Sequence, residues 1–234
     1  MTDSPIVVSK NIKRLLHDVR DIMKNPLTDN GIYYVHSDKH MFKGYAFIIG
    51  PEGTPYENGY YFFEFTFTEN YPFSPPKLTY LTNDGVTRFN PNLYKSGKVC
   101  LSILNTWEGE QWTSCQNISS ILLTLSSIFN NNPLTNEPGY TDKSSYCNDY
   151  KECIRFMNIK TAIIGVMDKK LIPYDFHMFY HIIKGHFEEN KEKVRNNILS
   201  MIDSKYDNSV IHFNLYSMKI VINYNTLKHA FDKL

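Results

Sequence analysis

Four short runs of aromatic and β-branched residues, separated by turn-forming residues, follow one another between positions 32 and 81. Such runs are typical of strands, and closely spaced strands favour an antiparallel meander. In the third run, Phe63, Phe65 and Phe67 alternate with Glu64 and Thr66, which places the three rings on one face of a sheet. The sequence therefore predicts a four-stranded antiparallel sheet with a buried face, made of Ile32–Val35, Met41–Ile49, Tyr60–Phe67 and Lys77–Leu81.

Segments with helical spacing of apolar residues precede and follow this predicted sheet. From about Ser9 to Lys24, apolar side chains recur three and four positions apart, and Ser9 is available as an N-terminal cap. Asn25-Pro26 ends this helix, because proline has no amide donor and disfavours a helical residue before it. A second apolar stripe, from Ile118 to Phe129, predicts a buried central helix, and another helix begins near Tyr150.

The segment after about residue 169 has mostly helical apolar stripes. Within it, Ile211, Phe213 and Leu215 alternate with polar residues, a pattern that fits either a strand or an extended segment. We therefore expect an α+β protein with a core domain at residues 1–168 and a mainly helical C-terminal extension at residues 169–234.

The composition limits the partners of this chain. Hydrophobic residues make up 42% of the sequence, enough for a sizeable core, and the 25 Lys and Arg against 24 Asp and Glu give no broad positive field. Apolar runs fall far short of the roughly 20 residues of a spanning helix. The amino terminus lacks the basic-then-apolar order of a secretory signal. We expect a protein of the cytoplasm or nucleus that binds neither nucleic acid nor membrane.

Residues 83–113 show no sustained period and predict a long loop, a feature that is usually functional in a compact domain. This loop holds Cys100, with Asn92 eight residues upstream. Cysteine type alone leaves two interpretations open, a small buried side chain or a nucleophile that reacts as its thiolate. Neither His nor Asp lies next to Cys100, so the sequence offers no adjacent base of the protease type. The four cysteines fit neither a dense disulfide framework nor a CxxC zinc pattern.

Several segments around Cys100 carry a family resemblance. They are Gly53-Thr54-Pro55-Tyr56, Tyr71-Pro72-Phe73-Ser74-Pro75-Pro76-Lys77, Asn90-Pro91-Asn92, Trp112 and Asn136-Glu137-Pro138-Gly139. In this order and spacing the chain resembles the ubiquitin-conjugating enzymes over about Ser9 to Ile163, and the run from Lys95 to Trp107 is similar to the Z-type members. The resemblance implies their fold, with an N-terminal helix, a four-stranded antiparallel meander, a long active-site loop and a central helix.

The resemblance also implies a role for each residue near Cys100. Cys100 corresponds to the cysteine that carries the modifier as a thioester, and we expect its sulfur at the lip of a shallow groove. Asn92 corresponds to the asparagine that stabilises charge on the carbonyl oxygen or holds the loop. Glu137 is our candidate for the acid that orients the incoming lysine, with a solvated loop carboxylate as the alternative. The resemblance makes Asn90, Pro91 and Asn136 loop-shaping residues, with Asn90 and Asn92 as simple turn residues around Pro91 as the alternative. Asn90 departs from the histidine that is usual in the family.

Partner surfaces follow from the same resemblance. The basic face of the first helix matches the surface that meets the activating enzyme, with a merely solvated face as the alternative; its residues are Lys10, Lys13 and Arg14. Tyr61 stands at the position of a ligase-contacting aromatic residue. Thr113 and Ser114, followed by Cys115, stand where many members have Ser-Pro-Ala. This departure predicts a restricted set of ligases or direct action on substrates.

These features predict an acyl-carrier transferase. It would take ubiquitin or a ubiquitin-like modifier from an activating enzyme at Cys100 and pass it to a lysine, alone or with a ligase. We expect the protein to be a monomer. It should need no cofactor or metal of its own, because adenylation of the modifier uses ATP elsewhere. We expect His177 and His181 to be exposed rather than metal-bound. The alternatives are a non-catalytic variant that holds ubiquitin or a ligase, and a less favoured thiol hydrolase.

Overall fold

The computed structural model of the protein describes residues 10–234. Helix α1 (Lys10–Lys24) confirms the predicted first helix, and the proposed cap Ser9 lies outside the described residues. Four antiparallel strands follow in the order β1-β2-β3-β4, as predicted. Their bounds are β1 Ile32–His36, β2 Lys43–Ile49, β3 Tyr60–Thr66 and β4 Lys77–Tyr80.

The sheet is buried on both faces along much of β3, whereas the sequence pattern predicted one buried face. Phe63, Phe65 and Phe67 are buried as expected. Phe62, which points to the opposite face, is also fully buried. The ring of Phe176, more than 100 residues downstream, packs edge-on against Phe62 with ring centroids 5.2 Å apart. Local alternation cannot show such a distant cover.

A long loop and two helices follow the sheet. Helix α2 (Ile118–Ser127) is the predicted central helix, and Asn117 caps it by accepting a hydrogen bond from the Ser120 amide. Helix α3 (Cys147–Met157) continues directly into the π-helix η4 (Asn158–Gly165). Short 3-10 helices interrupt the connecting loops at η1 (Thr28–Asn30), η2 (Ser102–Leu104) and η3 (Pro133–Asn136).

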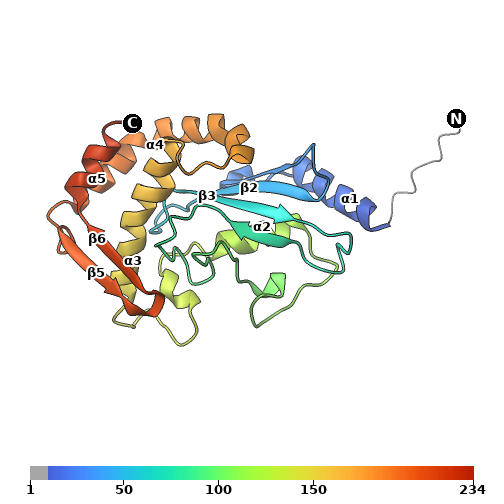
Figure 1. Ribbon diagram of the computed structural model, residues 1–234, viewed down its shortest axis with the longest axis horizontal. Helices are drawn as coiled ribbons and strands as arrows, with labels where there is room; N and C mark the ends of the chain where they lie inside the picture. The colour runs from blue at the N-terminus through green and yellow to red at the C-terminus, as the bar shows by residue number, and fades with distance from the viewer. Residues whose placement is uncertain (1–9) are drawn as a thin grey trace, which may run out of the picture.

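The C-terminal extension is mainly helical, as predicted, and also contains a hairpin. It consists of η5 (Tyr174–Phe179), α4 (Tyr180–Met201), β5 (Ser209–Phe213), η6 (Asn214–Tyr216), β6 (Met218–Ile222) and α5 (Tyr224–Phe231). Ile211 and Phe213 therefore belong to a strand, which settles the alternative that the sequence left open. Figure 1 shows the orange and red extension passing over the sheet and then down beside α3.

The extension and the preceding core share buried residues. Phe179 packs against Phe47 of β2 with ring centroids 4.9 Å apart, and Phe213 packs against Tyr150 of α3 at 5.1 Å. The buried hydrophobic residues of both segments form one cluster. The extension is thus part of the same hydrophobic core, so its position relative to the preceding loops is fixed by packing.

The remaining residues singled out in the sequence lie as follows. His177 and His181 are exposed, as expected, and Cys147 and Cys153 are buried. Cys115 is exposed, and all four cysteines are free thiols. None of the helices between residues 10 and 234 combines the length and apolar character needed to cross a membrane.

Candidate active site

Cys100 and Asn92 lie side by side in the loop between β4 and η2. The backbone amide of Cys100 donates to the carbonyl oxygen of Asn92 at 2.9 Å. The side-chain Nδ2 of Asn92 donates to the carbonyl oxygen of Cys100 at 2.7 Å. Asn92 is buried, and its amide is used here to hold the cysteine segment. This contact fits the second of the two roles that the sequence suggested for Asn92.

The Cys100 sulfur is covered, whereas we expected it at the lip of a groove. Cys100 is 2% exposed, and its Sγ donates to the carbonyl oxygen of Thr106 at 2.6 Å. Thr106 itself is exposed. The expectation of an open sulfur is therefore wrong for this conformation, because the loop after η2 folds back over the thiol. The cover is thin, since it consists of the backbone of a surface residue.

Thr106 is pinned by its own hydroxyl. Its Oγ1 accepts from the Leu101 amide at 2.9 Å and lies 3.1 Å from the carbonyl oxygens of Val99 and Leu101. These contacts hold the covering residue against the segments on either side of Cys100. Motion of Thr106 is therefore what would expose the sulfur.

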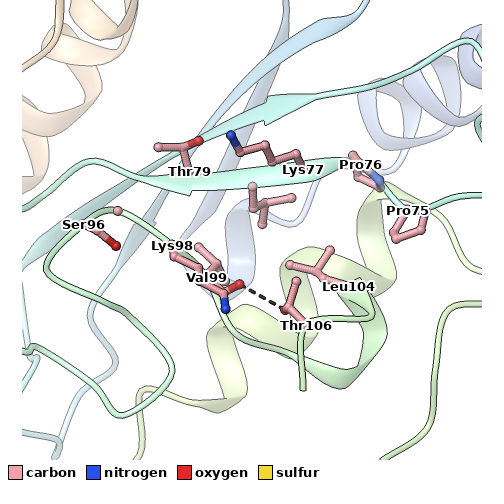
Figure 2. A pocket seen from close by; sticks show the side chains of 11 residues that line it. Pro75, Pro76, Lys77, Thr79, Ser96, Lys98, Val99, Leu104 and Thr106 are labelled. Carbon is pink, nitrogen blue, oxygen red and sulfur yellow. Dashed lines mark hydrogen bonds between the residues drawn. The ribbon is translucent and has the colours of Figure 1, made fainter. Parts of the chain in front are cut away.

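Two cavities meet at Thr106. One, of about 480 Å³, lies between β4 and the cysteine loop, and Figure 2 shows Lys77 and Thr79 on one wall and Thr106 on the other. The second, of about 610 Å³, is lined by Thr106, Trp107, Glu108 and Pro138, among others. Thr106, whose carbonyl covers the thiol, thus lines both cavities. Trp112, by contrast, is buried, and its Nε1 donates to the carbonyl oxygen of Pro72.

Asn90 and Asn136 form a polar centre beneath the loop. Asn90 is fully buried, and its Nδ2 donates to the Tyr56 hydroxyl at 2.9 Å and to the Ile128 carbonyl at 2.8 Å. Its Oδ1 accepts from the Asn92 amide at 3.0 Å. Asn136 Nδ2 donates to the same Ile128 carbonyl at 3.0 Å. Asn90 thereby ties the loop to the end of α2, a placement that agrees with a loop-shaping role.

Arg88 is a residue that the sequence reasoning missed. Its guanidinium donates to the carbonyl oxygens of Asn90 at 3.2 Å and Pro91 at 2.6 Å, and it lies over the Tyr94 ring with Cζ 3.4 Å from the centroid. Arg88 therefore holds the backbone of the turn that precedes Asn92. No spacing or motif distinguishes it from other arginines, because its hydrogen-bond partners are backbone carbonyls, which leave no side-chain pattern in the sequence.

Glu137 lies in the loop after η3, next to the cavity-lining Pro138. Its Oε2 accepts a hydrogen bond from the Tyr216 hydroxyl at 2.6 Å. The carboxylate is half-buried, so it is not the fully solvated loop acid of the alternative interpretation. The partner Tyr216 comes from η6 of the extension, which the sequence reasoning did not connect with the site.

The two lysines of the cysteine loop differ in their surroundings. Lys95 Nζ donates to the carbonyl oxygens of Tyr216 at 2.7 Å and Ser217 at 3.2 Å. Lys98 is exposed, with Nζ 5.4 Å from the Tyr94 ring centroid. Lys95 is therefore an anchor between the loop and the extension.

The residues predicted to meet an activating enzyme separate into three cases. Lys13 is exposed on α1. Arg14 binds within the molecule, where its guanidinium pairs with the buried Asp18 carboxylate at 2.9 Å and donates to the Ser114 carbonyl at 2.6 Å. The side chain of Lys10 lies outside the described residues. Of the two basic side chains that the structure describes here, Lys13 is the one available to a partner, because Arg14 is bound within the molecule.

The prediction that Tyr61 contacts a ligase is wrong, because Tyr61 is fully buried. Its ring packs 4.6 Å from that of Phe129, and its hydroxyl donates to Oδ1 of Asn158 at 2.6 Å. Thr113 and Ser114 are exposed, as a docking surface requires. The exposed aromatic ring in this part of the molecule is that of Phe73, which is 69% exposed and adjoins the Pro72 carbonyl that binds Trp112.

Among the described residues, no group of three or more His, Cys, Asp or Glu side chains is arranged to hold a metal ion. His186 is half-buried and pairs with the Tyr60 hydroxyl at 3.0 Å. Burial lowers the pKa of His186 below its usual value.

The class of protein follows from comparison with known families. The family model described as ubiquitin-conjugating enzyme matches residues 14–159. This stretch runs from α1 through the meander, the Cys100 loop and α2 into η4, in the order the resemblance implied. The chain therefore belongs to the ubiquitin-conjugating enzyme family.

Individual relatives agree with the Z-type resemblance. "Ubiquitin-conjugating enzyme E2 Z" of Xenopus tropicalis is 40% identical over 162 residues, which cover 68% of this chain and 51% of that protein. The Homo sapiens protein of the same name is 41% identical over 160 residues, covering 67% of this chain and 45% of that protein. The chain spans about half the length of these curated relatives.

A solved structure of human "Ubiquitin-conjugating enzyme E2 G1" is also similar to this chain. It is 29% identical, with a TM-score of 0.46, and the match covers 53% of this chain and 97% of that one.

Proposed function

We propose that this protein is a ubiquitin-conjugating transferase that carries its modifier as a thioester on Cys100. The observation that carries the proposal is the pair of hydrogen bonds between Asn92 and Cys100, which sets the cysteine of a family loop beside a side-chain amide. Cysteine suits a carrier because its thiolate is a good nucleophile and its thioester is readily displaced by an amine.

Two transfer steps make up the proposed reaction. The Cys100 thiolate attacks the modifier's carbonyl carbon on the activating enzyme, so that a new C–S bond forms, the old C–S bond breaks and the activating enzyme's cysteine leaves as its thiolate. The amine of a substrate lysine then attacks the same carbonyl carbon. A C–N bond forms and the C–S bond breaks. The amine loses a proton, and the departing Cys100 thiolate takes up a proton, which restores the thiol.

The Thr106 contact requires a movement before charging. Because Cys100 Sγ donates to the Thr106 carbonyl, the loop after η2 must lift before the sulfur can reach an incoming carbonyl carbon. The cavities on either side of Thr106 supply space for the modifier's tail on one side and the amine on the other. Glu108, on the wall of the second cavity, gives that side an acidic group suited to a lysine.

Asn92 would act after the loop opens. Its amide is a donor already directed at the Cys100 backbone, so a small rotation would turn it toward the oxygen of the tetrahedral intermediate. Glu137 would orient the attacking lysine and accept its proton. For partner surfaces, we propose Lys13 toward the activating enzyme, and Phe73 with Thr113 and Ser114 toward a ligase.

The second candidate function is a non-catalytic variant that binds ubiquitin or a ligase, and the covered sulfur is the observation that favours it. A thiol hydrolase has less support. Within the described residues, the thiol's hydrogen-bond partner is the Thr106 carbonyl and no histidine contacts it.

A charging assay separates these functions. The protein is incubated with activating enzyme, ATP and tagged ubiquitin, and the products are run on gels with and without reductant. A carrier gives an adduct that reductant removes, and Cys100→Ser gives an adduct that resists reductant, because an oxyester replaces the thioester. Cys115→Ser, which alters an exposed free thiol, is the matched control and should charge normally. Absence of any adduct contradicts the carrier function and supports the binding variant.

A further inference from the structure

The C-terminal extension reaches the candidate active site through the turn between β5 and β6. This turn contains η6, whose last residue is Tyr216. The Tyr216 hydroxyl donates a hydrogen bond to Oε2 of Glu137 at 2.6 Å. The two residues are 79 positions apart. Glu137 is the acid that we propose for the incoming lysine, so the bond joins the extension to the chemistry of the core.

Tyr216 is held firmly where it meets Glu137. Its carbonyl oxygen accepts from Lys95 Nζ at 2.7 Å, and its ring packs against Tyr150 and Phe213 with centroids 5.6 Å away in each case. The Arg88 guanidinium lies 5.1 Å from the Tyr216 ring centroid on the side of the cysteine loop. A ring held between two tilted aromatic rings and a cation leaves its hydroxyl little freedom.

Three segments of the site therefore meet at one residue of the extension, two at its side chain and one at its backbone carbonyl. Arg88 supports the Asn90-Pro91 turn, Lys95 belongs to the loop leading to Cys100, and Glu137 follows η3. Packing of Phe213 in the shared core sets the position of this turn. The turn consequently behaves as part of the site rather than as a remote appendage.

The Tyr216 hydroxyl remains a donor at physiological pH. Burial, followed by its hydrogen bond to Glu137, raises the pKa of Tyr216 well above its usual value. Because the phenol keeps its proton, it donates to the carboxylate, and this hydrogen bond uses the Oε2 oxygen of Glu137. The other oxygen is left for a further donor.

We infer that Tyr216 is a positioning residue for the transfer step, and that it fixes the Glu137 carboxylate so that its free oxygen faces the attacking lysine. The inference rests on the proposed function. In this step the amine nitrogen bonds to the thioester carbonyl carbon, the C–S bond breaks, and the amine proton passes to Glu137 and from there, through water, to the departing Cys100 thiolate. A carboxylate held in one orientation loses less entropy when it takes up the amine, which speeds the step.

The test compares single-turnover discharge of preformed Cys100 thioester to free lysine in four proteins. These are the parent, Tyr216→Phe, Glu137→Gln and the double variant. Tyr216→Phe removes the hydroxyl and keeps the ring, and Glu137→Gln keeps an oxygen that Tyr216 can reach. We expect Tyr216→Phe to lower the second-order discharge constant about fivefold in the parent and by less than about 1.5-fold in the Glu137→Gln background.

Tyr206→Phe is the matched control. Tyr206 is also a half-buried tyrosine of the extension, and its hydroxyl donates to the Asp149 carboxylate at 3.1 Å. It therefore loses a comparable hydrogen bond away from the site. Tyr206→Phe should discharge at the parent rate while lowering the unfolding midpoint about as much as Tyr216→Phe does.

Each result has a defined meaning. An equal loss in both backgrounds would show that Tyr216 acts through general packing, and an unchanged or faster discharge of Tyr216→Phe would also overturn the inference. If the parent forms no thioester at all, the proposed function fails and the inference falls with it. If the parent charges and only the Tyr216 effect is missing, the inference alone is wrong.

Discussion

The thiol of Cys100 donates a hydrogen bond to the carbonyl oxygen of Thr106, with Sγ and oxygen 2.6 Å apart. The residue proposed to carry the modifier is thus closed off by the backbone of a residue six positions along the chain. Because Thr106 is exposed and held mainly by its own hydroxyl, the closure can be weakened without touching the core. Reactivity of the sulfur then measures how often the loop opens.

Thiol labelling with iodoacetamide at pH 8 should follow the order of access. We expect Cys115 to react first, because it is exposed, and Cys100 to react in a slower phase limited by opening of the Thr106 loop. Burial raises the pKa of Cys153 to about 12. Its thiolate fraction at pH 8 is therefore on the order of 10⁻⁴, and it should react only on unfolding. Mass spectrometry of labelled peptides over time gives the order.

Thr106→Val tests the gate itself. The substitution keeps the side-chain shape and removes the hydroxyl contacts to Val99 and Leu101, which should raise the Cys100 labelling rate about tenfold. Ser127→Ala, which removes an exposed hydroxyl at the end of α2, is the control and should leave the rate unaltered. A Cys100 rate that is already as fast as that of Cys115 in the parent would contradict the closed loop.

Asn92→Ala should separate charging from discharge. The truncation removes the donor to the Cys100 carbonyl and the amide proposed to stabilise the tetrahedral intermediate. We expect the variant still to accept ubiquitin, and to lose about 10²-fold in the discharge rate to free lysine, as is common when one such donor is removed. Rates from non-reducing gels, with equal amounts of charged protein, measure the effect. Discharge at the parent rate would remove Asn92 from the mechanism.

Arg14→Lys should destabilise the protein, although both side chains are basic. Lysine can keep the ion pair with Asp18 but cannot also reach the carbonyl oxygens of Ser114 and Gln116. We expect a loss of about 1–2 kcal/mol in the free energy of unfolding, measured by urea denaturation. Arg20→Lys, on the exposed side of the same helix, is the control and should change little. Equal stability of the two variants would show that the Arg14 bonds carry no net energy.

Phe73 and Tyr61 should respond in opposite ways. Phe73→Ala removes a ring that is 69% exposed, so we expect normal folding and a reduced response of discharge to an added ligase. Tyr61→Phe leaves the buried Oδ1 of Asn158 without this donor and should cost about 1–2 kcal/mol of stability without a specific loss of the ligase response. Thermal melts and ligase-stimulated discharge distinguish them. A ligase defect confined to Tyr61→Phe would restore the original prediction.

Much of the fold could be predicted because its signals are local. The apolar spacing that defines α1 and α2, and the alternation that defines β3, lie within single segments and arise from the geometry of one helix or one strand. The resemblance added the candidate roles of Cys100 and Asn92. Both residues lie within the stretch, residues 14–159, that the family model matches. Asn90 and Asn136, predicted as loop-shaping residues, do meet beneath the loop.

Tertiary packing decided what no short window of sequence contains. An alternating strand shows which side chains share a face, but not which faces a distant segment will cover, so the pattern of β3 indicated one buried face while Phe176 of the extension covers the other. The ligase contact of Tyr61 followed from the resemblance alone, although Tyr61 shares the buried face of Phe63 and Phe65. The Tyr216 bond to Glu137 joins residues 79 positions apart. The Thr106 cover over Cys100 and the Arg88 support of the turn join residues six and three positions apart, but they involve backbone carbonyls of irregular loops, which leave no side-chain pattern. Local patterns and the resemblance were enough to predict the four strands of the sheet, the helices and the candidate nucleophile. The hairpin of the extension and its contacts with the two loops came from tertiary packing, because long-range contacts form only when the whole core packs.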